Sequence, residues 1–276
     1  MSSPAHGQLT AAELRAEVAK LDWYHTLELA PGVVTPGWFD HRSILHQIPL
    51  PDSLAGMRCL DVGTFNGHWA FELERRGAAE VVAVDVLDPA RWDWPVGSDP
   101  SAIAEISKRM EDGNGFELAK AALSSSVTRY DCSVYDLKPE QFGVFDLVYV
   151  GSLLVHLRDP VRALEAVRSV CGGSLVLVDG IDLPLTLKAS RTPAFRFDGA
   201  GRPWWFTANL VGLARIVESA GFELTAEPRR LYVPPGAGWN PSRRAVGGLF
   251  SRTGREALIG AWKGDPHGVV TARPRS

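Results

Sequence analysis

The sequence predicts an α/β protein in which an open, mostly parallel sheet is covered by helices on both faces. Short apolar runs at 59–62, 81–86, 144–150 and 174–178 are typical of strands buried on both sides. Segments with helical spacing lie between these runs, and glycines separate strand from helix. With a further strand candidate at 127–132, five such alternations in about 120 residues indicate a parallel sheet.

The N-terminal region predicts one helix followed by an ordered loop. Thr10 can cap a helix that runs to about Leu21, with Glu13 three residues later as in a capping box. Residues 23–51 are dense in proline, glycine, histidine and aromatic residues. We therefore expect an ordered lid in this segment, and not a linker.

The first strand of the sheet leads into a glycine turn. The run 59–62 carries Asp61 and breaks at Gly63, and Gly67 opens a helix over 68–77. Such a turn lets a ligand approach the backbone at the carboxyl end of a strand.

The second strand, 81–86, contains an acid near its end, Asp85. Strand, glycine turn, helix, strand and acid form the first half of a nucleotide-binding βαβ unit, in which the acid can accept both ribose hydroxyls. A dinucleotide site requires further glycines where this chain has Phe65 and His68. The sequence therefore fits NAD poorly.

Three more strands are expected at 127–132, 144–150 and 174–178, with a helix that starts at Pro160 before the last of them. Ligands of such sheets bind outside the carboxyl ends of the strands. The loops expected at this edge are Asp61–Gly67, Asp85, Ser133–Asp136, Gly151–His156 and Asp179–Asp182.

The C-terminal part predicts a helix at 208–220, a strand at 222–233, and a last strand at 269–273, at the end of the segment 264–274. These two strands would complete seven strands with an antiparallel edge, while 183–205 lacks regular periodicity. We divide the chain into an N-terminal helix and lid segment, residues 1–52, and a main domain, residues 53–276, with an insertion at about 183–208.

Composition narrows the class of protein. The net charge of −3 over 276 residues argues against a strong nucleic-acid binder, which would need a basic surface. Cys59, Cys132 and Cys171 are expected to be buried thiols. The first residues lack the pattern of a signal peptide, and no apolar run is long enough for a membrane span. We expect a cytoplasmic protein that does not contact a membrane.

The order Asp61-Val-Gly-x-x-x-Gly67 resembles motif I of class I S-adenosylmethionine (SAM) methyltransferases, although Phe65 departs from its usual glycine. Over residues 22–274 the chain also resembles a bacterial group akin to the tRNA wobble-uridine carboxymethyltransferase family. The segments that carry this second resemblance are Trp23–Thr26, Thr35–Arg42, motif I, Asp146–Pro160, Trp204–Asn209 and Ala220–Phe222. The resemblance implies a Rossmann-like seven-stranded sheet and methyl transfer from SAM.

Two departures argue against the tRNA activity itself. That family implies carboxy-SAM, a cation before the core and a tyrosine ahead of the histidine in its Leu-x-His motif. Here no lysine occurs between Lys20 and Lys108, and Val155 precedes His156. Arg42 can substitute for the cation, so the tRNA interpretation stays open. We expect SAM as the donor and S-adenosylhomocysteine (SAH) as the product.

The resemblance also implies roles for the cofactor site. Gly63 and Gly67 let the methionine part approach the backbone, Asp61 helps bind its amino group directly or through water, Asp85 takes the ribose diol, and Ser133–Val134 borders the adenine. The complete expected cofactor site is Asp61, Gly63, Thr64, Phe65, Gly67, Asp85, Val86, Ser133, Val134 and Gly151.

The expected catalytic residues are His156 and Asp179. Methyl transfer is an in-line displacement in which positioning contributes much of the catalysis. His156 follows the fourth strand, and the pKa range of histidine suits a general base. Asp179 and Asp182 could bind a substrate hydroxyl, but two acids do not make a metal site. The expected substrate-binding residues are Tyr24, His25, Arg42, Trp205 and Asn209.

The sequence thus predicts a SAM-dependent methyltransferase that acts on oxygen or nitrogen of a small molecule, with a specialised metabolite as the expected acceptor. A tRNA wobble-base enzyme and a catalytically silent SAM-binding regulator are the alternatives, and an NAD oxidoreductase comes last. The small-molecule acceptor is the expected partner, and the oligomeric state stays open, a homodimer included.

Overall fold

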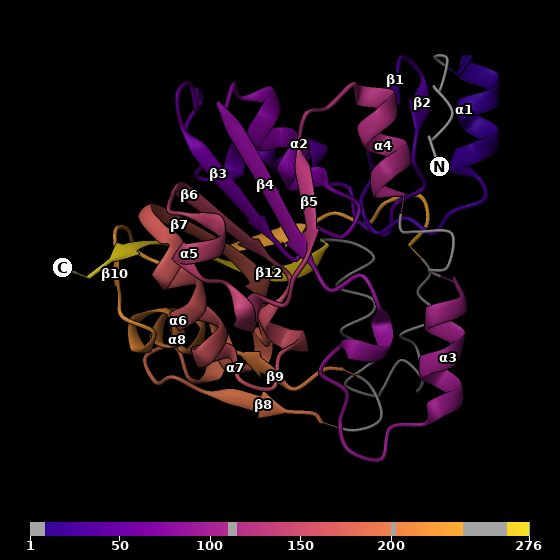
Figure 1. Ribbon diagram of the computed structural model, residues 1–276. Coiled ribbons are helices and arrows are strands. Elements are labelled where there is room, and N and C mark those ends of the chain that lie inside the picture. The colour runs from indigo at the N-terminus through magenta and orange to yellow at the C-terminus, as the bar shows by residue number, and fades with distance from the viewer. Residues whose placement is uncertain (1–8, 110–114, 200–202, 240–263, 276) are drawn as a thin grey trace.

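The computed structural model describes residues 9–109, 115–199, 203–239 and 264–275. Its centre is one eight-stranded sheet with the order β10-β12-β7-β6-β3-β4-β5, in which β11 also pairs with β12 (Figure 1). The parallel strands are β3 (Arg58–Val62), β4 (Glu80–Asp85), β5 (Thr128–Asp131), β6 (Phe145–Gly151) and β7 (Cys171–Gly180). The antiparallel strands are β10 (Phe222–Leu224), β11 (Arg229–Val233) and β12 (Asp265–Pro274).

The last two of the seven expected strands differ from the prediction, and β12 extends beyond the expected 269–273. The single strand expected at 222–233 is two short strands, and both pair with the same edge of β12, β10 at 272–274 and β11 at 265–269. The sheet therefore has eight strands in seven positions. The parallel strands and the antiparallel end of the sheet agree with the predicted fold class.

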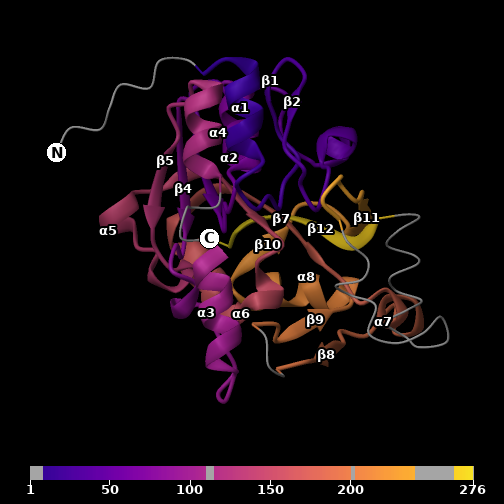
Figure 2. The ribbon, with the colours of Figure 1, turned by 90° about the vertical axis from the view of Figure 1, so that its right-hand side faces the viewer.

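Helices cover both faces of the sheet (Figures 1 and 2). The α-helices are α1 (Ala11–Val18), α2 (His68–Arg75), α3 (Pro100–Arg109), α4 (Phe116–Leu123), α5 (Pro139–Phe142), α6 (Pro160–Val170), α7 (Leu183–Lys188) and α8 (Leu210–Ser219). The 3-10 turns are η1 (Arg42–Gln47), η2 (Pro89–Arg91), η3 (Val134–Asp136) and η4 (Leu154–His156). Two hairpins complete the chain: β1 (Glu28–Ala30) with β2 (Val33–Val34), and β8 (Phe195–Phe197) with β9 (Phe206–Ala208).

Alternation along the strands produces two separate cores. In β3, Leu60 and Val62 belong to the core that α6 and α8 cover, whereas Cys59 belongs to the core on the other face. That second core includes Trp23 of the lid segment and Phe116 of α4. The N-terminal segment is therefore packed onto one face of the sheet, and it borders the carboxyl ends of the strands.

Local signals explain where several helices begin. Thr10 and Glu13 form the predicted capping box on α1, which ends at Val18 and is shorter than expected. Pro160 occupies the first turn of α6 as predicted. The interval 183–205, which was expected to be irregular, contains α7 and β8. Among the described residues, no helix is both long and apolar enough to cross a membrane.

Candidate functional site

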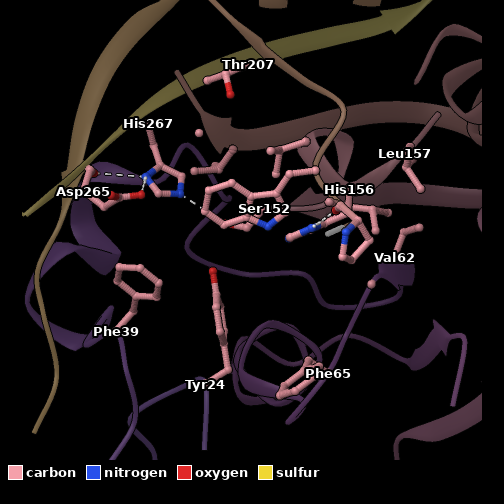
Figure 3. Close-up of a pocket in the computed structure, with 18 of the residues that line it drawn as sticks. Tyr24, Phe39, Val62, Phe65, Ser152, His156, Leu157, Thr207, Asp265 and His267 are labelled. Carbon is pink, nitrogen blue, oxygen red and sulfur yellow. Dashed lines mark hydrogen bonds and ion pairs between the residues drawn. The ribbon is translucent and has the colours of Figure 1, made fainter. Parts of the chain in front are cut away.

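A large cavity lies at the carboxyl ends of the parallel strands (Figure 3). Its volume is about 1350 Å³, which exceeds the roughly 300–1,000 Å³ of an ordinary small-molecule site. Its walls come from the lid segment, the turn after β3, the ends of β4 and β6, the segment around α7, and the start of β12. The cavity has room for two small molecules side by side.

The glycine turn after β3 forms one wall of the cavity. Gly63 has φ +76°, and a Cβ there would lie 3.3 Å from the side chain of Leu153, so the position favours glycine. Phe65 lines the cavity with φ +45°, a left-handed conformation that is costly for a bulky residue. The backbone of this turn is thus exposed to a ligand at Gly63, and the ring of Phe65 replaces a second glycine.

Asp85 holds this turn against β4. Its Oδ2 accepts a hydrogen bond from the N–H of Phe65 at 2.7 Å, and its Oδ1 accepts one from the N–H of Val86 at 2.8 Å. Burial raises the pKa of Asp85 to about 6. Each carboxylate oxygen can accept more than one hydrogen bond, so Asp85, which lines the cavity, fits the role of a ribose acceptor.

Asp61 lies behind the cavity wall. Its Oδ2 accepts hydrogen bonds from the hydroxyl of Thr64 at 2.7 Å and from the N–H of Ala70 at 3.0 Å. It is 1% exposed, and burial raises its pKa to about 7. Neither Asp61 nor Thr64 lines the cavity, so the geometry favours a role in joining the turn to α2 over direct contact with a cofactor.

Gly67 also lies outside the cavity lining. It has φ +89°, and a Cβ there would lie within 2.8 Å of the rings of Phe71 and Phe116. Gly67 is therefore required for the start and packing of α2, and the predicted contact with the cofactor does not follow from its position.

The remaining expected cofactor residues do line the cavity, namely Val86, Ser133, Val134 and Gly151. Trp92 joins them, although the sequence analysis missed it, and its indole N–H donates to the carbonyl of Val86 at 3.0 Å. The sequence around Trp92 is rich in aromatic residues, which was a possible signal. The segment lacks helical or strand periodicity, however, so its position relative to the strand that ends at Asp85 could not be predicted.

Asp179 is placed differently from the expected catalytic acid. One oxygen accepts hydrogen bonds from the N–H groups of Leu153 and Leu154 at 2.8 and 2.7 Å, and the other accepts one from Gly180 at 2.8 Å. Burial raises its pKa, and it does not line the cavity. The structure therefore favours a positioning role for Asp179, which fixes the loop that carries His156.

His156 lines the cavity, as expected for a candidate base. Its Nδ1 lies 2.8 Å from the carbonyl oxygen of Pro203. A carbonyl only accepts, so Nδ1 carries the hydrogen and the lone pair is on Nε2. The ring of Trp204, which also lines the cavity, is 6.0 Å away. His156 thus has the tautomer of a base in a fixed orientation.

Only two of the five expected substrate-binding residues, Tyr24 and His25, line the cavity. Figure 3 shows the Tyr24 hydroxyl directed into the space between Phe39 and Phe65. Both residues belong to the aromatic lid segment, which was expected to cover the cofactor.

The other three side chains contact structural partners and lie outside the cavity lining, so their expected contacts with a substrate do not follow from their positions. Arg42 forms an ion pair with Asp40, with Nη2 and Oδ2 2.7 Å apart. Trp205 donates from its indole nitrogen to the carbonyl of Asp93 at 2.7 Å. Asn209 caps α8 and is fully buried. None of the three lines the cavity, because each side chain satisfies a structural partner.

A second imidazole, which the sequence analysis missed, faces the same cavity. His267 of β12 is 3% exposed, and its Nε2 lies 3.1 Å from Oγ of Ser152. Both residues line the cavity. The sequence signal was a histidine near the start of the last predicted strand. The pairing of that strand with β7, which brings His267 to Ser152, could not be derived from the sequence of the strand.

Three further histidines form a buried cluster between the lid segment and α2. The ring centroids of His25, His41 and His68 are 5.1 to 5.4 Å apart. Burial lowers the pKa of His68 to about 4 and holds those of His25 and His41 well below their usual range. These imidazoles are therefore neutral near pH 7.

This histidine cluster contains many unsatisfied polar atoms. Among the described residues, six buried side-chain N and O atoms lack a hydrogen-bond partner, and four belong to this cluster: His25 Nδ1, His41 Nδ1 and both ring nitrogens of His68. The other two are Thr26 Oγ1 and Asn66 Nδ2. Such atoms usually bind water or a ligand. Since His25 and His41 line the cavity, this end of it is polar and uncharged. No group of three or more metal-ligating side chains suited to a metal ion occurs in the described part of the chain.

Comparison with known proteins finds similar sequences among methyltransferases. The chain is 28% identical over 145 residues to a ubiquinone biosynthesis O-methyltransferase of Acinetobacter baumannii, which covers 48% of this chain and 52% of that protein. The chain thus spans about half the length of the curated relatives it matches.

Solved structures share the fold. The N-terminal domain of EvdMO1 with bound SAH aligns over 97% of this chain and 98% of its own, with a TM-score of 0.52 and 16% identity. A methyltransferase of Haloferax volcanii, solved with the Trm112 methyltransferase activator, aligns over 85% of this chain and 88% of its own, with a TM-score of 0.51 and 12% identity.

A family model described as a methyltransferase domain matches residues 41–227. The match includes the glycine turn, all five parallel strands and most of the cavity walls. Because it covers more than half of the chain, the protein belongs to the methyltransferase domain family, as motif I predicted, and the methyl donor of this family is SAM.

Proposed function

We propose that the protein transfers a methyl group from SAM to an oxygen or nitrogen atom of a small molecule. The observation that carries the proposal is the single cavity of about 1350 Å³, which reaches from the glycine turn to the lid segment and β12. A donor and an acceptor can meet inside it. The similarity to an enzyme named as an O-methyltransferase of ubiquinone biosynthesis supports a small acceptor.

The cofactor side of the cavity fits SAM. Gly63 offers backbone without a side chain, and Asp85 offers carboxylate oxygens at the end of β4. Val86 and Ser133–Val134 lie where the adenine is expected, after β4 and β5. When bound, SAM supplies an electrophilic methyl group on a positively charged sulfur.

The acceptor side lies between the lid segment and β12. Tyr24 and Phe39 offer aromatic surfaces, while His25 and His41 offer neutral imidazoles. This wall suits an uncharged ring compound that carries hydroxyl or carbonyl groups. The chain's part in the reaction is to hold such an acceptor in line with the methyl group, to exclude water, and to accept a proton.

A thermal-shift titration with SAM, SAH, carboxy-SAM and NAD tests the cofactor. A ligand at a hundred times its dissociation constant adds about 2.7 kcal/mol to the free energy of unfolding. We expect stabilisation by SAM and SAH, and its loss in Asp85→Ala. Stabilisation by NAD alone would contradict the proposal, and a preference for carboxy-SAM would favour the tRNA interpretation.

Transfer of a radiolabelled methyl group tests the acceptor class. We expect label in a mixture of hydroxylated aromatic compounds, and none in deproteinised tRNA. Label in tRNA alone would overturn the small-molecule assignment. Binding of SAM with no transfer to either would favour the silent SAM-binding regulator.

A further inference from the structure

We propose that His267, acting through Ser152, is the base that takes the proton from a hydroxyl group of the acceptor. The inference rests on the proposed function and assigns the base to the antiparallel end of the sheet. Three independent features support it: the tautomer of His267, the backbone conformation of Ser152, and the position of both residues in the cavity.

The tautomer of His267 follows from its partners. Nδ1 lies 3.0 Å from the backbone carbonyl oxygen of Asp265, which can only accept, so Nδ1 carries the hydrogen. The lone pair is then on Nε2, and the Ser152 hydroxyl, 3.1 Å away, donates to it. This is the arrangement in which an imidazole draws a proton from a hydroxyl group.

Three titratable groups face His267. Oδ2 of Asp265, two residues earlier in β12, lies 3.8 Å from Nδ1. Asp179 of the neighbouring β7 interacts electrostatically with His267, and so does His41 of the lid segment. These groups come from β12 itself, from the neighbouring strand β7 and from the lid segment.

Ser152 is held in an unusual conformation. Its φ is +50°, which a non-glycine residue seldom adopts, and its N–H donates to the carbonyl of Val178 at 2.8 Å. Strained residues of this kind cost about 1–3 kcal/mol and cluster at active sites. The strain here places the Ser152 hydroxyl beyond the end of β6, on the cavity side of His267.

The surroundings indicate the class of acceptor. The ring of Phe39 lies 6.4 Å from that of His267, and Figure 3 shows Tyr24 beside them, with His267 and His156 on opposite sides of the cavity. An aromatic wall next to a hydroxyl-directed base suits a phenol. Such an acceptor needs a base, because its neutral oxygen is a weak nucleophile.

The acceptor oxygen forms a bond to the methyl carbon while the carbon–sulfur bond of the donor breaks, and that electron pair stays on sulfur. The acceptor proton passes to Oγ of Ser152 as the Ser152 proton passes to Nε2 of His267. The products are a methyl ether, SAH and an imidazolium that later releases its proton to water.

The test compares His267→Gln, Ser152→Ala, His156→Gln and the exposed His46→Gln. SAM binding is measured first by calorimetry, and we expect it to be unchanged in all four. Failure of the unmodified protein to bind SAM would refute the proposed function and not the base assignment. The probe acceptor is catechol, assayed from pH 5 to 9.

We expect His267→Gln to lower kcat by 10²- to 10⁴-fold, with residual activity that rises with pH as catechol ionises in solution. Ser152→Ala should lower kcat at least 10-fold, and His46→Gln should leave it unchanged. A further variant, His267→Ala, tests rescue. Added imidazole should restore its turnover, which a merely structural role of His267 would not permit. The assignment is overturned if His156→Gln shows this pattern and His267→Gln does not.

A second readout needs no turnover. 4-Nitrophenol changes colour when it loses its phenolic proton, so it reports proton transfer in the SAH complex. We expect nitrophenolate absorbance with the unmodified protein and with His46→Gln below the pH at which free nitrophenol ionises, but not with His267→Gln. No absorbance with the unmodified protein, or equal absorbance with His267→Gln, would also overturn the proposal.

Discussion

Three carboxyl groups, Asp61, Asp85 and Asp179, lie near the carboxyl ends of the parallel strands β3, β4 and β7, and each accepts hydrogen bonds from nearby backbone. Burial raises the pKa of all three. Only Asp85 also lines the cavity. At the scale of single residues, acids at similar sequence positions thus differ in role. Asp85 is the proposed ligand contact, whereas Asp61 and Asp179 hold loops in place.

The support role of Asp179 can be tested by Asp179→Asn. The amide nitrogen cannot accept hydrogen bonds, so at least one of the N–H donors at Leu153, Leu154 and Gly180 is left unpaired in a buried place. We expect the free energy of unfolding to fall by about 2–4 kcal/mol in urea. The exposed Asp52→Asn should change it by less than about 0.5 kcal/mol. Normal stability with a hundredfold loss of kcat would restore the catalytic role predicted from the sequence.

The positive φ of Phe65 yields a second prediction. In most positions alanine is more favourable than glycine, but at φ +45° the Cβ is costly. We expect Phe65→Gly to be more stable than Phe65→Ala by about 1 kcal/mol in chemical denaturation. Ala121→Gly in α4 should show the opposite sign. Equal stability of the two Phe65 variants would mean that the turn relaxes without its ring.

At the scale of elements, the lid segment and α2 meet through the histidine cluster. Asn66, in the turn before α2, accepts hydrogen bonds from the N–H groups of Tyr24 and His25 at 2.6 and 3.2 Å. His68, the first residue of α2, contacts His25 and His41 of the lid segment. The contact between these elements therefore depends on neutral imidazoles.

Because this contact requires neutral imidazoles, we expect the free energy of unfolding to fall in acid. Burial lowers the pKa of His68 from 6.5 to about 4, so the unfolded chain binds the proton more tightly. The stabilisation is complete above pH 6.5 and is lost as the pH falls towards 4. Between pH 7.5 and 5, the unmodified protein should lose about 2 kcal/mol relative to His68→Leu. The raised pKa values of Asp61 and Asp85 change the free energy of unfolding in the opposite direction as the pH falls. Both acids are present in both proteins, so their contributions cancel in the comparison.

Urea unfolding at the two pH values measures this difference. The exposed His46→Leu serves as the control, and its stability relative to the unmodified protein should not change with pH. A pH-independent difference between His68→Leu and the unmodified protein would show that water or another group satisfies the charged form of His68 inside the cluster.

Elements defined by local pattern were predictable, and those defined by distant partners were not. The run 144–150 is apolar because both faces of β6 are buried, and its pattern alone indicates a strand. The break between β10 and β11 and the short helix α7 leave no such periodic signal. These elements form where the rest of the molecule offers a partner.

The site shows the same division. Gly63 and Asp85 were found because strand ends place them at one edge of the sheet. Asn209 was expected to hydrogen-bond a substrate. Its side chain instead caps α8, and its amide nitrogen donates to the carbonyl oxygens of Ala189 and Thr192. His267 lies 115 residues from Ser152 in the chain. Only the antiparallel pairing of β12 with β7 brings them together.

At the scale of the whole molecule, the cavity separates the sheet edge from the lid segment. Both contribute to its walls, and so do the segment around Trp92 and the start of β12. A ligand that fills this space contacts parts of the chain that are far apart in sequence. Binding should therefore stabilise the lid segment as well as the glycine turn.

Hydrogen exchange can measure this coupling. At SAH concentrations a hundred times the dissociation constant, openings that expel the ligand become about a hundredfold rarer. We expect slower exchange in peptides from 23–41 and 86–94, where backbone bonds such as Thr26 N–H to Phe39 carbonyl hold the lid together. Peptides from α5, which does not line the cavity, should change only with global unfolding, and Asp85→Ala should abolish the effect. Slower exchange in the glycine turn with unchanged exchange in the lid segment would mean that cofactor binding does not stabilise the lid. In that case the acceptor would have to close the lid.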